Sequence, residues 1–195
     1  MNVGRYMHHD PVTVLPEATL GEAKRVMEEN GFGILLVASA AHELTGFITK
    51  GSLKEVSDWE KPVGEACFPA NFSVAPTDTL EKAALILLSN RLVLLPVVEE
   101  GKLVGVITQS EILRALAQAL GIGLEGTRLT VRVQSDPRDL YAVIGVLRDH
   151  NVRLVSLARG AEGNGHQEII LRVQGITDKE GLKAALEQAL TAKEE

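Results

Sequence analysis

Two stretches of sequence decide the fold: Asp10–Val37, DPVTVLPEATLGEAKRVMEENGFGILLV, and Ala70–Val97, ANFSVAPTDTLEKAALILLSNRLVLLPV. Aligned at a spacing of about 60 residues, they carry identical residues at fixed positions, and the identities continue into the following hairpin. The identical pairs are Val14/Val74, Pro16/Pro76, Thr19/Thr79, Leu20/Leu80, Ala23/Ala83, Asn30/Asn90, Leu35/Leu95, Val37/Val97, Leu44/Leu103, Gly46/Gly105, Ile48/Ile107 and Thr49/Thr108. Ordered identities at one spacing indicate an internal repeat, so residues 1–120 are expected to form two copies of one unit.

Each copy is predicted to run strand, helix, strand, turn, strand, helix. In the first copy Thr19-Leu-Gly-Glu22 is a capping box that opens a helix, and Gly31 suits its left-handed end. In the second copy Thr79 takes the cap position and Asn90 lies near the stop. The apolar runs that follow are typical of strands buried on both faces. Since one unit is too small to cover its own sheet, the two copies should pack together.

The pattern changes after a glycine-rich segment at 121–127, which is expected to be a hinge. Apolar and polar residues then alternate over Arg128–Gln134, which predicts a half-exposed strand. A helix, strands over Val152–Leu157 and Glu168–Gln174, and a last helix opened by a capping box at Thr177–Glu180 complete the order βαββα. No clear fourth strand follows, and an unpaired sheet edge favours pairing between chains.

These patterns predict an α/β (α+β) protein with the domain boundaries 1–60, 61–120, 121–127 and 128–195. The composition agrees: 45% of the 195 residues are apolar, which allows a sizeable core, and only 4% are aromatic. A single cysteine excludes an internal disulfide framework, and the net charge of −6 without a visible basic cluster argues against nucleic acid. The apolar runs are too short to span a membrane and no signal-peptide pattern opens the chain, so a cytoplasmic protein is expected.

Residues 1–120 resemble a tandem pair of CBS domains, the Bateman module, in LVLLPVVEEGKLVGVIT (92–108) and in the lead-in VGRYMHHDPVTV (3–14). Residues 128–190 resemble an ACT domain, in SDPRDLYAVIGVLRDHNVRLVSL (135–157). This domain order is similar to that of the acetoin-utilisation B-type proteins, which implies a role in acetoin or acetate metabolism. The resemblance implies clefts for adenosyl compounds such as AMP, ATP or S-adenosylmethionine, and amino-acid sites at ACT dimer interfaces.

The resemblance also implies a ligand motif, G-x-x-T-x-x-D, where the last strand meets its helix. The second copy reads Gly105-Val-Ile-Thr108-Gln-Ser-Glu111. A threonine hydroxyl and free N–H groups at a helix N-terminus suit phosphate, and a carboxylate three residues on can accept from ribose hydroxyls. Glu111 is one methylene longer than the aspartate of the motif. Thr108 and Glu111 also form a capping-box pattern that needs no ligand.

The rest of this pocket is expected from the neighbouring strands. By the resemblance, Val93, Leu94 and Pro96 would close over the adenine, and Ser73 is the matching first-strand hydroxyl. Taken alone, these residues indicate core packing only.

The first copy offers a weaker cleft. It reads Gly46-Phe-Ile-Thr49-Lys-Gly-Ser52, with Thr13 as the first-strand hydroxyl. Ser52 cannot supply a charged acceptor with two oxygens, so this cleft is expected to be degenerate or to take a different ligand.

In the ACT-like region the resemblance places an amino-acid site at the loop Asp136-Pro137-Arg138, where the family has a glycine. The Arg138 side chain would either block such a pocket or bind a carboxylate. An oligomerisation surface is the favoured interpretation of this domain.

No catalytic or metal site is predicted. His8, His9 and Asp10 are adjacent, and adjacent residues rarely point at one ion. Nucleophile-elbow, P-loop and HExxH motifs are absent from the sequence. The leading hypothesis is a non-enzymatic regulator, a homodimer without a cofactor, whose CBS pair binds an adenine nucleotide as effector and acts on a partner enzyme that the sequence does not identify. The alternative is an oligomeric scaffold with degenerate ligand sites.

Overall fold

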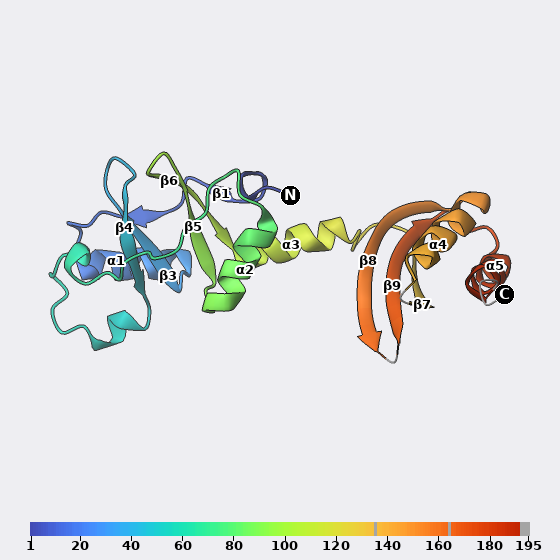
Figure 1. Cartoon of the computed structure of the whole chain (residues 1–195). Coiled ribbons are helices and arrows are strands. Elements are labelled where there is room, and N and C mark those ends of the chain that lie inside the picture. Colours follow the sequence, from blue (N-terminus) through green and yellow to red (C-terminus); the bar gives the residue numbers. More distant parts are fainter. Residues whose placement is uncertain (135, 164, 192–195) are drawn as a thin grey trace. The chain divides into compact units, whose positions relative to one another are not determined.

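The computed structural model describes residues 1–134, 136–163 and 165–191, and the chain divides into two compact units, Met1–Leu113 and Arg114–Glu195 (Figure 1). Ser135, in the quoted ACT-like stretch, and residues 192–195, at the end of the expected C-terminal domain, lie outside the described residues. The predicted mixed α/β fold is confirmed.

The first copy forms a three-stranded sheet in the order β2-β3-β4, from Thr13–Val14, Ile34–Ala38 and Leu44–Thr49. Strand β2 runs parallel to β3, and β3 pairs antiparallel with β4. Helix α1, Leu20–Asn30, connects the first two strands. The last element is only a 3-10 turn, Ser52–Glu55, where the sequence predicts a helix.

The second copy repeats this plan with a full terminal helix. It contains α2 (Leu80–Asn90), β5 (Leu94–Glu99), β6 (Lys102–Thr108) and α3 (Gln109–Ala119). Its first strand is reduced to a single parallel bridge between Val74 and Val97.

The helix starts predicted at Thr19 and Thr79 are confirmed, and Asn90 is the last residue of α2. The Thr19 side chain accepts from the Glu22 N–H while the Glu22 carboxylate accepts from the Thr19 N–H, a complete capping box. Gly31 ends α1 in the left-handed region at φ 69°. In α2 the left-handed residue is Arg91, at φ 54°, because Asn90 is still helical and its amide donates to the Ile86 carbonyl.

The segments that precede each copy are exchanged between the copies. The N-terminal lead-in, residues 1–9, docks on copy 2: the Gly4 N–H donates to the Pro76 carbonyl at 2.8 Å. The second lead-in, residues 61–69, docks on copy 1: the Gly64 N–H donates to the Pro16 carbonyl, also at 2.8 Å. The lead-ins contain the 3-10 turns η1 (Val3–Arg5) and η3 (Val63–Glu65), the short strand β1 (His8–His9), and Phe68.

Each lead-in adds an edge to the sheet of the other copy. Strand β1 pairs antiparallel with β6, with His8 opposite Val106 and His9 opposite Gly105. In the equivalent place Phe68 bridges Phe47 of β4. Between the two sheets an apolar cluster joins the copies; its buried members are Leu36, Ala38 and Leu103, and Leu44, Phe47, Leu94 and Val106 pack against them.

The C-terminal unit has the predicted order βαββα. Strands β7 (Thr127–Gln134), β8 (Arg153–Gly163) and β9 (His166–Gln174) form an antiparallel sheet in the order β7-β9-β8, and β8 and β9 are long and curved (Figure 1). Helices α4 (Pro137–Asp149) and α5 (Lys179–Thr191) contribute Val143, Leu147, Leu182 and Leu186 to its core. The last helix begins later than predicted, because Asp178, not Thr177, accepts from a helix N–H, that of Gly181.

The glycine-rich segment before β7 is bonded to this sheet. Ser156 donates to the Leu120 carbonyl at 2.8 Å, Arg172 to Leu124 at 2.9 Å, and Gln174 to Glu125 at 2.7 Å. These side-chain bonds hold residues 120–125 against β8 and β9.

Candidate functional site

The strongest candidate site lies where β6 runs into α3. The Thr108 hydroxyl donates to Glu111 Oε2. The oxygen of the same hydroxyl accepts from the Ser110 N–H at 3.1 Å. The structure therefore brings together the two motif residues that sequence analysis selected. Thr108 and Glu111 form a hydrogen bond with each other without a ligand. The geometry is therefore compatible with both interpretations of the motif, a ligand site and a helix cap.

Glu111 is a buried acid, with its side chain only 7% exposed. Its Oε1 lies 3.0 Å from Nε2 of His8, whose side chain is 59% exposed and comes from the exchanged lead-in. Burial alone would raise the pKa of the Glu111 carboxyl, but hydrogen bonds from Thr108 and His8 and the charge on His8 outweigh it. The pKa is therefore held below its ordinary value, and the group stays ionised near neutral pH.

The expected adenine wall lines a separate, small cavity. Val93, Leu94 and Pro96 line a space of about 60 Å³ together with Phe47 and Phe72. Small-molecule pockets typically hold roughly 300–1,000 Å³. Thr108 and Glu111 do not line this cavity, and neither does the exposed Ser73. The two halves of the expected nucleotide site are thus not joined in one open pocket, and a ligand would have to open it.

The weaker cleft of copy 1 is occupied by its own side chains. The Ser52 N–H donates to Thr49 Oγ1 at 3.1 Å, and the Ser52 hydroxyl donates to the Thr49 carbonyl at 2.8 Å. Thr13 lies elsewhere, lining a different cavity of about 340 Å³ that includes Asp10 and His42. The three residues grouped by sequence analysis do not form one site.

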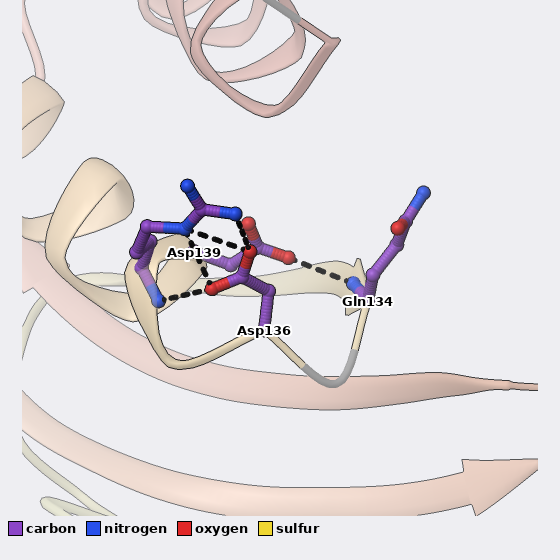
Figure 2. A network of polar contacts seen from close by, with 4 residues as sticks. Gln134, Asp136 and Asp139 are labelled. Carbon is purple, nitrogen blue, oxygen red and sulfur yellow. Dashed lines mark hydrogen bonds and ion pairs between the residues drawn. The ribbon is translucent and has the colours of Figure 1, made fainter. Parts of the chain in front are cut away.

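The ACT-like loop is closed by an ion pair within the loop itself. Arg138 donates through Nη2 and Nε to Asp136 Oδ2, at 2.6 and 2.9 Å, and the Asp139 carboxylate accepts from the Gln134 N–H at 2.9 Å (Figure 2). The hydrogen bond and charge of Asp136 raise the pKa of the Arg138 guanidinium. Pro137 begins α4, and its side chain lies outside what the structure describes. Two roles were considered for Arg138: to block the pocket or to bind the carboxylate of a ligand. Its ion pair with Asp136 is closer to the first role.

Over residues 1–134, 136–163 and 165–191, no three His, Cys, Asp or Glu side chains are grouped so that they could hold a metal ion. In the same ranges, no helix combines the length and the apolar character needed to cross a bilayer.

Sequence analysis considered His8 only as a metal ligand and missed both its contact with Glu111 and the exchange of the lead-ins. A signal was present, since Val3-Gly4 recurs as Val63-Gly64 at the same spacing as the other identities. The repeat could therefore have been extended toward the N-terminus, but which copy each lead-in covers depends on tertiary packing.

A family model of the CBS domain matches residues 3–58 and 63–118, and the chain belongs to this family. Among curated proteins, inosine-5'-monophosphate dehydrogenase of Methanocaldococcus jannaschii is 33% identical over 132 residues, which are 67% of this chain and 26% of that protein. The chain thus spans about a quarter of the length of this relative.

Several solved structures contain a similar pair of CBS domains. AcuB of Vibrio cholerae, whose name assigns it to acetoin utilization, is 29% identical with a TM-score of 0.57, over 63% of this chain and 94% of that one. CBSX2 of Arabidopsis thaliana, solved with AMP, is 29% identical with a TM-score of 0.55, over 60% and 96%. A CBS domain pair/ACT domain protein of Thermotoga maritima is 27% identical with a TM-score of 0.56, over 62% and 99%. The predicted CBS tandem with an additional C-terminal sheet domain is confirmed.

Proposed function

We propose that this chain is a non-enzymatic regulatory protein whose CBS pair senses an adenine nucleotide of the AMP, ATP and S-adenosylmethionine class. The observation that carries the proposal is the convergence of the Thr108 hydroxyl and the ionised Glu111 carboxylate at the start of α3. A helix N-terminus attracts phosphate, and a carboxylate can accept from both ribose hydroxyls. The AMP complex of the relative CBSX2 supports this ligand class.

Binding in this proposal includes an opening step. The small cavity beside Pro96 must widen, and Glu111 must exchange an internal hydrogen bond for one to the ligand. Such a cost lowers the apparent affinity by the fraction of molecules in the competent state. The opening shifts the packing of the two copies, and the C-terminal unit transmits that shift to a partner protein or a second subunit. The similarity to AcuB supports a place in acetoin or acetate metabolism.

Calorimetric titration with AMP, ADP, ATP and S-adenosylmethionine tests the proposal. We expect saturable heat with at least one of them, reduced at least tenfold in affinity by Thr108→Ala, because that change removes the hydroxyl that would contact phosphate. No heat at millimolar ligand would contradict the proposal.

A second candidate function, an oligomeric scaffold, is favoured by the free edge of the C-terminal sheet. Strand β7 pairs with β9 over eight residues without irregularity, whereas β8, on the other edge, has two register shifts. Beside β7 a groove of about 480 Å³ runs along α5, lined by Leu129, Leu182 and Leu186 among others. Within the described residues β7 has no second partner strand, and such an edge is competent to pair with another chain.

The backbone direction along β7 gives this candidate a test. The Gln134 N–H donates to Asp139, so it points away from β9. Backbone N–H groups along a strand of an antiparallel pair point alternately toward and away from the partner strand. Thr130 lies four residues before Gln134, so its N–H also faces the open edge. Thr130→Pro removes that donor and Thr130→Val keeps it. If the edge joins subunits, native mass spectrometry will show a smaller assembly for the proline variant only, while an unchanged assembly would contradict pairing at β7.

A further inference from the structure

Both oxygens of the carboxylate at the start of α3 have a protein partner. The Thr108 hydroxyl donates to Oε2, and Nε2 of His8 lies 3.0 Å from Oε1. The Glu111 side chain is only 7% exposed, so both contacts lie largely inside the protein. A ligand hydroxyl that seeks Oε1 meets the imidazole there.

His8 is held in place by its backbone and not by burial of its side chain. Val3 is fully buried, and the Val3 N–H donates to the Asp78 carbonyl at 2.8 Å, which anchors the lead-in on copy 2. Gly105 then allows β1 to approach β6, since a Cβ there would lie 2.7 Å from the His8 carbonyl oxygen. The imidazole itself is 59% exposed, so it can turn away from Glu111 while β1 stays paired.

The other copy has no such contact. There the equivalent lead-in residue is Phe68, whose ring packs on Phe47 with centroids 5.7 Å apart, and Ser52 stands where copy 2 has Glu111. The histidine and the acid occur together in the copy that also keeps the better ligand motif.

We propose that His8 is the residue that sets the affinity and the pH range of this site, because it competes with the ribose of an adenine ligand for Glu111. The inference rests on the proposed nucleotide function and deepens it. Ligand binding moves the imidazole off Oε1 and a ribose hydroxyl donates in its place. A protonated imidazole binds the carboxylate more tightly than a neutral one, so binding strengthens as the pH rises and histidine loses its proton.

Other charged groups lie near this contact along the chain. Across from β1, strand β6 presents Val106 and Gly105. On α3, Arg114 follows Glu111 by about one turn, and its guanidinium is a cation. Directly after His8 in the chain come His9, which is the other histidine of β1, and the acidic Asp10. The matched control is therefore His9→Ala.

Adenosine is the appropriate probe because, unlike AMP, it has no phosphate that titrates between about pH 6 and pH 8. We expect the adenosine affinity of the unaltered protein to rise about fivefold across this interval, the size of one partly exposed ion pair. His8→Ala should bind about fivefold more tightly than the unaltered protein at the lower pH and lose the pH dependence. His8→Gln, which donates but does not titrate, should also be independent of pH, and His9→Ala should behave as the unaltered protein.

The outcomes separate the two proposals. Binding with equal affinity and equal pH dependence in all four proteins would overturn the role of His8 and leave the nucleotide function standing. Weaker binding in both His8 variants would make His8 a ligand contact and overturn the competition. No binding of adenosine or AMP in any of them, with circular dichroism showing folded protein, would overturn the nucleotide function itself.

Discussion

The two CBS copies share the same order of helices and strands. They differ at the junction between the last strand and the turn or helix that follows it. In copy 1, Ser52 and Thr49 close a short 3-10 turn, and no charge is involved. In copy 2, Glu111 and Thr108 begin an eleven-residue helix, and His8 reaches the acid from the exchanged lead-in. The comparison teaches that two copies with similar packing can differ at one junction through single residues, which form a neutral turn in copy 1 and a charged contact in copy 2.

The largest expected effect tests whether copy 1 needs its exchanged lead-in. A Cβ on Gly46 would lie 2.3 Å from the Phe68 carbonyl oxygen, a backbone atom that cannot turn aside. Gly46→Ala should therefore lower the free energy of unfolding by about 3 kcal/mol, in the upper range for overpacking. Urea denaturation followed by circular dichroism measures it.

The matched control for this substitution is Gly33→Ala, because a Cβ there meets nothing within 4 Å. A similar loss in both variants would mean that the close approach at Gly46 is not what the fold requires.

A second pair of substitutions tests how symmetric the exchange is. Val3 and Val63 are both fully buried, one in each lead-in. Val3→Ala and Val63→Ala should each cost about 2 kcal/mol, from two lost methyl groups and the cavity they leave. Losses that differ by more than about 1 kcal/mol in urea denaturation would show that one copy depends on its partner more than the other does.

The third prediction uses the charge that only copy 2 carries. The pKa of Glu111 is lowered, so its ionised form stabilises the fold above the ordinary carboxyl pKa of about 4.3, and this contribution is lost as the pH falls through the lowered pKa. Glu111→Gln should therefore cost about 1–2 kcal/mol at pH 7, and the difference from the unaltered protein should shrink at about pH 4 and below.

Ser52→Ala is the counterpart in copy 1. It removes the neutral hydrogen bonds of the Ser52 hydroxyl, so its cost of about 1 kcal/mol should not change with pH. Parallel pH profiles of unfolding for the two variants would contradict the assignment of the charge to copy 2 alone.

The smallest effect concerns the helix ends. Gly31 and Arg91 occupy the same left-handed position after α1 and α2, at φ 69° and 54°. Glycine adopts this conformation without the steric cost that a Cβ brings. Arg91→Gly should stabilise the protein by about 0.5–1 kcal/mol and Gly31→Ala should destabilise it by about 1 kcal/mol, read from thermal unfolding midpoints. The same sign for both would show that the two ends are not equivalent.

Much of this molecule was predictable from local signals. The cap residues, the apolar runs and the repeat predicted α1, α2 and most strands of both copies, because these depend on residues a few positions apart. The start of α5 is shifted by one residue because Asp178, next to Thr177, caps it. The candidate site was predicted in part: Thr108 and Glu111 belong to one local motif, whereas His8 lies about a hundred residues away along the chain.

The sequence by itself determined that a duplicated α/β unit is followed by a βαββα domain, and that a threonine and an acid meet at one strand-to-helix junction, since each of these follows from periodicity and short-range hydrogen bonding. Only the tertiary structure decided which lead-in covers which copy, that His8 binds Glu111, and that the apolar wall lines only a small cavity. Those outcomes depend on the packing of surfaces distant in sequence, where the burial of Val3 and the missing Cβ of Gly105 accommodate the lead-in on copy 2.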